Sequence, residues 1–168
     1  MKNFFRKVAF GLKPEEKAPS DPLMWAQKQV ETIPELNWKG KYIYSEKEMR
    51  KHWIKQRVTE ETTFKKKYKN DPEGLRIAEK KLEDDSGKKF WPNNEICMRH
   101  AEAVRSNSPV LAKLWYFWTN HFTISDAQSL PSFSTGAYQR EFIRANMDKT
   151  FETMAIEGTI AWPMIMHL

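Results

Sequence analysis

The sequence has little of what builds secreted scaffolds, sheets or metal clusters. Cys97 is its only cysteine, so one chain can form neither an internal disulfide nor a cluster of thiolate metal ligands, and we expect Cys97 to be a small buried hydrophobe. Six glycines stand against nine prolines, and runs of valine and isoleucine are short, which favours helices over sheets. These shortages predict an all-α fold.

Long apolar runs are also missing. Nothing reaches the ~18 apolar residues that a membrane-spanning helix needs. Arg6 and Lys7 interrupt the apolar positions at the N-terminus, so no signal peptide is expected and a cytoplasmic location is the default, with the compartment left open. Residues 160–168 form an apolar stretch without a polar tail, which we interpret as a sign that the chain is part of a longer protein.

Aromatic residues are abundant, with seven Trp, ten Phe and five Tyr. Side chains of this size are stabilised mainly by burial, so a disordered chain is not expected. The net charge of +6 is compatible with an anionic partner, such as nucleic acid, a phospholipid surface or an acidic polysaccharide. It also serves solubility, and it therefore selects no partner by itself.

Helix-start and helix-stop signals divide the chain into an N-terminal segment, a charged arm and a helical core, which span residues 1–44, 45–90 and 91–168. The N-terminal segment holds one helix. It starts at Asp21-Pro22, where an N-cap precedes a proline in the first turn, and it continues to about Thr32.

The arm begins with a capping box formed by Ser45 and Glu48. A long charged helix follows to about Asn70, and a second one runs from Asp71 to about Asp85. Because their apolar positions are sparse, both helices should pack along a narrow stripe and leave most of their surface in water. The sequence thus predicts a helical arm or hairpin.

The core should contain an irregular bundle of helices. One helix follows Pro92, and a second starts at Ser108-Pro109 and is apolar on nearly all sides, so we expect this Trp-rich helix to be central. After a Ser-rich loop over residues 125–135, a last helical stretch should run from Gly136 and end near Gly158 and Pro163.

Several segments of the chain carry a common resemblance: Phe10-Gly11-Leu12, Asp21-Pro22 with Trp25 and Gln29, FWTNHF at 117–122 and GAYQREFIR at 136–144. They resemble a large bacterial family catalogued as domain of unknown function 1800. The resemblance covers about residues 4–34 and 95–166 and leaves the charged middle unmatched. The chain departs from the family pattern at Gln139, where Glu is usual, and at Trp162-Pro163-Met164, where His-Pro-Ala is usual.

Members of this family are typically several hundred residues long, so the resemblance implies the N-terminal part of such a protein. It implies no established reaction. The common signatures of ATPases, esterases and metalloproteases are absent from the sequence.

His121 is the first candidate for chemistry. It lies one turn from Phe117 and Trp118, so we expect it to be partly buried. It is either a hydrogen-bonded core histidine that holds the following loop, or a general base or an anion contact. A metal site is not predicted, because no other histidine stands at i,i+4 from His121. No cofactor is predicted.

The second candidate is a charged cluster. On an α-helix, Arg140 and Arg144 would share one face, and Arg144 could pair with Glu141 and Asp148. The cluster is then a structural ion network, or its two guanidinium groups bind an anion. If His121 converges on it, a base and an anion clamp would surround one pocket.

Three functions remain open. The first is a scaffold or partner-binding module whose aromatic surfaces are completed by a protein partner or by missing C-terminal sequence. The second is part of an acid/base or hydrolytic enzyme that uses His121 and Glu141 for catalysis and Arg140 and Arg144 for an anionic substrate. Nucleic-acid binding through Lys65–Lys67 is the least favoured, because acidic residues interrupt this basic run.

Overall fold

The structure is a computed structural model that describes residues 2–38, 43–86, 91–125 and 132–168. In these ranges the chain is all-α and contains no strand, as predicted. The longer elements are α1 (Lys2–Val8), α2 (Pro22–Lys28), α3 (Glu46–Thr59), α5 (Pro72–Ser86), α6 (Trp91–Arg105), α7 (Pro109–His121) and α9 (Phe151–Ile160). The short ones are η1 (Glu60–Phe64), α4 (Lys65–Lys67), η3 (Ser132–Ser134), α8 (Thr135–Tyr138), η4 (Gln139–Ile143), η5 (Arg144–Asn146) and α10 (Trp162–Ile165).

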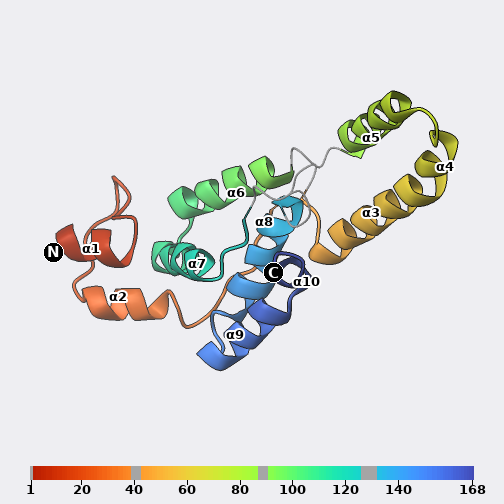
Figure 1. Cartoon of the computed structure of the whole chain (residues 1–168). Coiled ribbons are helices and arrows are strands. Elements are labelled where there is room, and N and C mark those ends of the chain that lie inside the picture. The colour runs from red at the N-terminus through yellow and green to blue at the C-terminus, as the bar shows by residue number, and fades with distance from the viewer. Residues whose placement is uncertain (1, 39–42, 87–90, 126–131) are drawn as a thin grey trace.

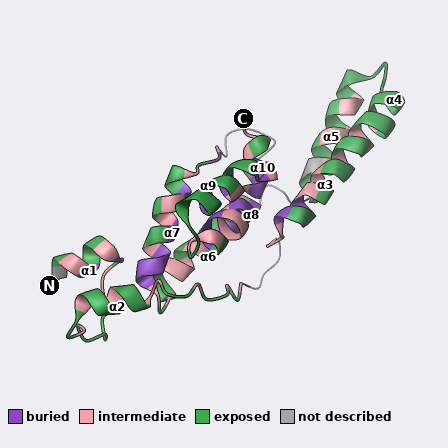
Figure 2. Ribbon diagram, turned by 90° about the horizontal axis from the view of Figure 1, so that it is seen from below, coloured by how far each residue is buried: buried purple, intermediate pink, exposed green. Residues whose placement is uncertain are grey.

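The helices are arranged in three regions along the molecule (Figure 1). α1 and α2 lie at one end, α6 to α10 form the central body, and α3 to α5 form a hairpin that projects at the other end. Buried positions gather in the body, whereas the hairpin is mostly exposed (Figure 2). We call this hairpin, residues 46–86, the arm. The division of the chain into separate domains stays a prediction.

Two groups of buried apolar side chains hold the body together. The first joins α7 to the segments that follow it and consists of Trp115, Ile124, Tyr138, Ile143 and Ala161. The second joins the first turn of the arm to α6 and α8 and consists of Met49, Trp91, Phe133 and Ala137. Met49 and Trp91 are completely buried, so the arm is attached to the body through the start of α3.

The arm begins with the predicted capping box. The Glu48 N–H donates to Oγ of Ser45 at 3.3 Å, and the Ser45 N–H donates to a carboxylate oxygen of Glu48 at 2.8 Å. From there α3, the π-helical segment η1 and α4 follow one another to Lys67, close to the predicted end. Within α3 only Glu46 and Met49 are buried, which agrees with its sparse apolar pattern.

α7 is less enclosed than its sequence predicts. Its buried residues, Pro109 to Ala112, Trp115 and Thr119, lie on one side. Leu114, Phe117 and His121 are exposed on another. One side of this Trp-rich helix is therefore open to solvent, although its sequence is apolar on nearly all sides.

The last helical stretch is broken in two. The side-chain amide of Asn146 donates to the Phe142 carbonyl at 2.8 Å, which satisfies a carbonyl at the end of the first part. Thr150 then caps α9 by accepting the Thr153 N–H at 3.2 Å. Gly158 lies inside α9 rather than at its end.

Three smaller expectations also differ from the structure. α2 ends at Lys28, several residues earlier than predicted, and α1 was not predicted at all. Cys97 is exposed on α6 and is not the buried hydrophobe that its residue type suggested. Most of the predicted Ser-rich loop, residues 126–131, lies outside the described residues, and Ser132 to Ser134 form the turn η3.

Candidate functional site

Arg140 connects three parts of the fold. Its Nε donates to both carboxylate oxygens of Glu95 on α6, at 3.2 and 3.0 Å, and its Nη2 donates to one of them at 2.8 Å. Nη2 also lies 2.7 Å from the Tyr44 carbonyl oxygen, just before α3, and Nη1 lies 3.4 Å from Glu141. Only 4% of the Glu95 side chain and 15% of the Arg140 side chain are exposed. Arg140 is thus bonded within the fold, and its predicted role in anion binding stays a prediction.

Glu141 lies at the first turn of α3. Its carboxylate oxygens accept the Glu46 N–H at 3.3 and 3.1 Å, where a negative charge complements the positive end of the helix dipole. Burial raises the pKa of Glu141, although the Glu46 N–H and the Arg140 charge act in the opposite direction. A carboxyl group with a raised pKa suits a general acid. The catalytic role of Glu141 itself stays a prediction.

Arg144 is buried in a different place. Its Nη2 donates to the Pro34 carbonyl at 2.6 Å, and its guanidinium lies 5.6 Å from the centre of the Trp115 ring. Burial lowers the pKa of Arg144, but an arginine keeps its charge in proteins. Its predicted pairing with Glu141 and Asp148 does not occur, since Glu141 bonds to the start of α3 and Asp148 pairs with Lys149 at 3.3 Å.

The two arginines diverge because this segment is not an α-helix. In the π-helical segment η4 the Arg144 N–H bonds to the carbonyls of both Gln139 and Arg140. The bond to Gln139 spans five residues, so residues four apart no longer lie above one another as they do in an α-helix. Arg140 therefore faces α6 and the arm, while Arg144 faces Trp115 on α7.

Gly136 allows α8 to approach α6 at the position of Glu95. A Cβ at Gly136 would overlap the Cβ and Cγ of Glu95 and lie 2.7 Å from its Cδ. Because Cβ of Glu95 is fixed by its own helix, this overlap could not be relieved by rotating the side chain. The ion pair with Arg140 thus depends on a residue without a side chain.

His121 is exposed at the end of α7, which corrects the expectation of a partly buried side chain. Its ring lies 4.9 Å from the Phe117 ring and 5.7 Å from the Trp118 ring. Phe151 of α9 adds to this group, with its ring 5.7 Å from that of Trp118 and 6.5 Å from that of Phe122. We call these five residues the aromatic surface cluster.

The described residues do not place His121 in contact with the charged cluster. Its ring neighbours are Phe117 and Trp118, whereas Arg140 and Arg144 bond to Glu95 and to Pro34. The predicted pocket with a base and an anion clamp on opposite walls is therefore not formed by these groups.

A cavity of about 240 Å³ lies between α6 and α8 and was not anticipated. It is lined by Glu95, Ile96, Arg99, Ile124, Thr135, Gly136 and Gln139. We call it the α6–α8 pocket. In the sequence, Glu95 and Arg99 stand at i,i+4, the spacing of an exposed intrahelical pair. Each has another partner in the structure: Glu95 bonds to Arg140, and Arg99 donates to the side-chain oxygen of Gln139.

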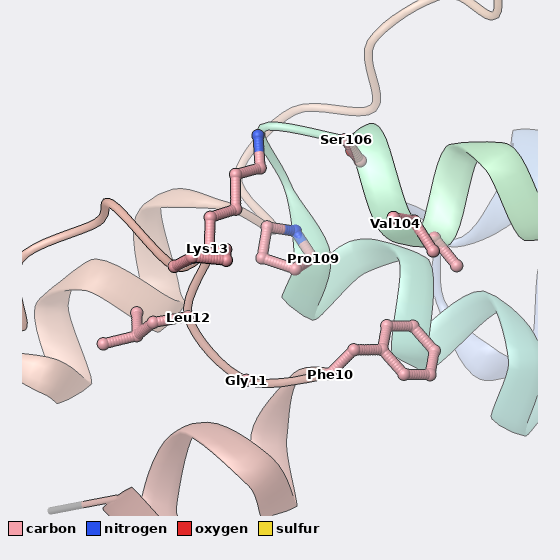
Figure 3. Close-up of a pocket in the computed structure, with 9 residues that line it drawn as sticks. Phe10, Gly11, Leu12, Lys13, Val104, Ser106 and Pro109 are labelled. Atoms are coloured by element: carbon pink, nitrogen blue, oxygen red, sulfur yellow. The ribbon is translucent and has the colours of Figure 1, made fainter.

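A second hollow lies where the loop after α1 meets the start of α7 (Figure 3). Phe10 and Leu12 form one side, and Val104 and Pro109 form the other. The Lys13 ammonium lies 3.3 Å from the Arg105 carbonyl and 3.0 Å from the Asn107 side chain, so it bonds to the end of α6. This hollow is mainly apolar. Lys13 is the charged residue that Figure 3 labels, and its ammonium already has partners.

Metal and membrane sites have no support in the described ranges. No group of three or more His, Cys, Asp or Glu side chains there could hold a metal ion. None of the helices described is long and apolar enough to cross a bilayer.

The fold and its buried ion network define an all-α protein whose sequence carries no recognisable catalytic signature. The chain belongs to the family described as protein of unknown function (DUF1800), whose model matches residues 3–168. This confirms the resemblance and extends it, because the match also includes the charged arm that the motifs had left unmatched. Neither a curated protein nor a solved structure matches the chain.

Proposed function

We propose that this chain is a helical scaffold that binds another protein through the aromatic surface cluster. One observation carries the proposal: 50% of Phe117 and 61% of Phe151 are exposed, although both rings pack against other aromatic rings. Half-exposed rings held in place by neighbours are typical of interface hot spots, where a partner completes their burial. Trp118 and Phe122 beneath them fix their positions.

The charges near this cluster favour a protein over a nucleic acid. α9 carries two acidic residues, Glu152 and Glu157, and no basic one, while Asp148 and Lys149 pair with each other. Stacking proteins that bind single strands combine aromatic rings with a positively charged groove, and these residues supply none. In the arm, Lys65 pairs with Glu61 at 2.7 Å, so the basic run is partly neutralised there as well.

The enzyme alternative has less support. It needs His121 near the two arginines, and the contacts of these residues lead in different directions. A scaffold needs only a stable body and an accessible surface, and the buried network around Arg140 serves the first of these requirements.

Site-specific photocrosslinking would test the proposal. A photoreactive phenylalanine analogue at position 117 or 151 of the full chain, expressed in cells, should give the same discrete protein adduct. The analogue at Ile77, an exposed apolar position in the arm, should not. The purified partner should then bind Phe117→Ala at least about tenfold more weakly, as expected for a hot spot, and should bind Ile77→Ala unchanged. Equal crosslinking from position 77, or no adduct from 117 and 151, would count against the proposal.

A further inference from the structure

Arg99 is the charged residue of the α6–α8 pocket that has no counter-ion. No carboxylate of the described residues forms an ion pair with it. Its Nη1 donates to the Gln139 side-chain oxygen, its guanidinium lies 4.8 Å from the centre of the Tyr116 ring, and its Nε is buried without a hydrogen-bond partner. A guanidinium carries five donors and a permanent charge, so these neutral contacts leave Arg99 with unused capacity to bind an anion.

The other charged residue of the pocket does not compete for Arg99. The carboxylate of Glu95 accepts three contacts from Arg140, one of them at 2.8 Å, and its charge is thereby compensated. The pocket therefore contains one uncompensated positive charge. It lies beside Ile96 and Ile124, which make part of the wall apolar.

We propose that the α6–α8 pocket binds a small organic carboxylate, whose charged end pairs with Arg99 and whose apolar end lies against Ile96 and Ile124. The planar fork of a guanidinium matches a carboxylate. One cation compensates a single negative charge, whereas a phosphate dianion would remain partly uncompensated near Glu95. The pocket volume of about 240 Å³ suits a compact molecule.

Calorimetric titration of the full chain with benzoate and with benzyl alcohol tests this proposal. The two probes share a ring and differ in charge. We expect saturable binding of benzoate at one site and binding of benzyl alcohol at least about tenfold weaker, because the alcohol cannot form charge-assisted hydrogen bonds. Inorganic phosphate should also bind more weakly than benzoate.

The most direct test is a variant that supplies a competing carboxylate from the chain itself. Ile96 lines the pocket one turn before Arg99 and is 41% exposed, so Ile96→Glu places a carboxylate beside the guanidinium without removing a buried core residue. We expect this variant to lose at least about tenfold in benzoate affinity, since Arg99 is already paired. Cys97→Glu is the matched control, because it adds the same charge at the next, exposed position of α6, which does not line the pocket.

Arg99→Gln gives a second test, with thermal unfolding as the check that each variant is folded. Loss of benzoate binding in Ile96→Glu and Arg99→Gln, with binding retained in Cys97→Glu, would support the proposal. Absence of saturable benzoate binding to the wild-type chain would overturn it. So would equal binding of benzyl alcohol, tighter binding of phosphate, or unchanged benzoate affinity in Ile96→Glu.

Discussion

Replacement of Arg140 by methionine would test how firmly the buried ion pair joins the arm to the body. Methionine has a similar length but no donor, so the Glu95 carboxylate would stay buried without a cation, and the Tyr44 carbonyl would lose its 2.7 Å contact. Removal of one partner from a buried pair typically costs about 3–5 kcal/mol, because the remaining charge is uncompensated. We expect Arg140→Met to lower the free energy of unfolding by this amount.

Thermal and urea unfolding, followed by far-UV circular dichroism, would measure the loss. In a protein of this size each kcal/mol corresponds to about 2–4 °C, so Tm should fall by roughly 6–20 °C. The double variant Glu95→Leu/Arg140→Met should recover much of this, because an apolar replacement of a buried pair is often neutral.

The control for this prediction is Arg76→Met. Arg76 also pairs with a glutamate, Glu73, at 2.6 Å, but both side chains are about two-thirds exposed, at 66% and 65%. An exposed pair contributes little to stability, because water screens both charges. The reasoning would be refuted if Arg140→Met cost no more than Arg76→Met, or if the double variant were less stable than the two single losses predict together.

Three other predictions follow from local geometry. Gly136→Ala should lower the free energy of unfolding by about 1–3 kcal/mol or more, because the new Cβ overlaps Glu95. Gly158→Ala should cost less, because the nearest neighbour of its new Cβ is a side-chain methyl at 3.2 Å. Urea unfolding of the two variants would measure this difference. Ser45→Ala should cost about 1 kcal/mol, since α3 loses its cap, and amide exchange in the first turn of α3 should rise. Because the pKa of Glu141 is raised in the fold, ionisation of this carboxyl group opposes folding. The stability of the wild type relative to Glu141→Gln should therefore fall as the pH rises above the ordinary glutamate pKa. Thermal melts of both proteins over a pH series would measure this, and the opposite slope would contradict the reasoning.

Local signals in the sequence were sufficient for the helices but not for their ends. Ser45 with Glu48 and the Asp-Pro steps fix helix starts through caps that involve neighbours in sequence, and these predictions are confirmed by α2, α3 and α5. At the break before α9, the Asn146 side chain donates to the Phe142 carbonyl. The sequence gives no period or composition that marks such a bond.

For the charged cluster, the expectation placed Arg140 and Arg144 on one helical face and paired Arg144 with Glu141 and Asp148, about one turn away. These pairs do not form, and the two arginines bond elsewhere. Their actual partners, Glu95 and the Pro34 carbonyl, are 45 and 110 residues away in sequence. The π-helical segment changes which residues share a face, and the burial of Glu95 depends on the space left by Gly136. Both features are set by tertiary packing, which a helical-wheel argument does not include.

The arrangement also indicates where binding can occur without loss of the fold. Arg140 and Arg144 are occupied by buried carboxylate and carbonyl groups, so a ligand that recruited either of them would have to break contacts that join η4 and η5 to Glu95, Tyr44 and Pro34. Among the described residues, Arg99 bonds only to the neutral Gln139 side chain, and the rings of Phe117 and Phe151 are exposed. A ligand or partner could therefore use them without breaking a buried ion pair. Pairing of an uncompensated charge and burial of an exposed apolar ring both stabilise a complex with a partner, and neither disturbs the network around Arg140. Binding at these two places and stability at the junction should therefore vary independently from one variant to another.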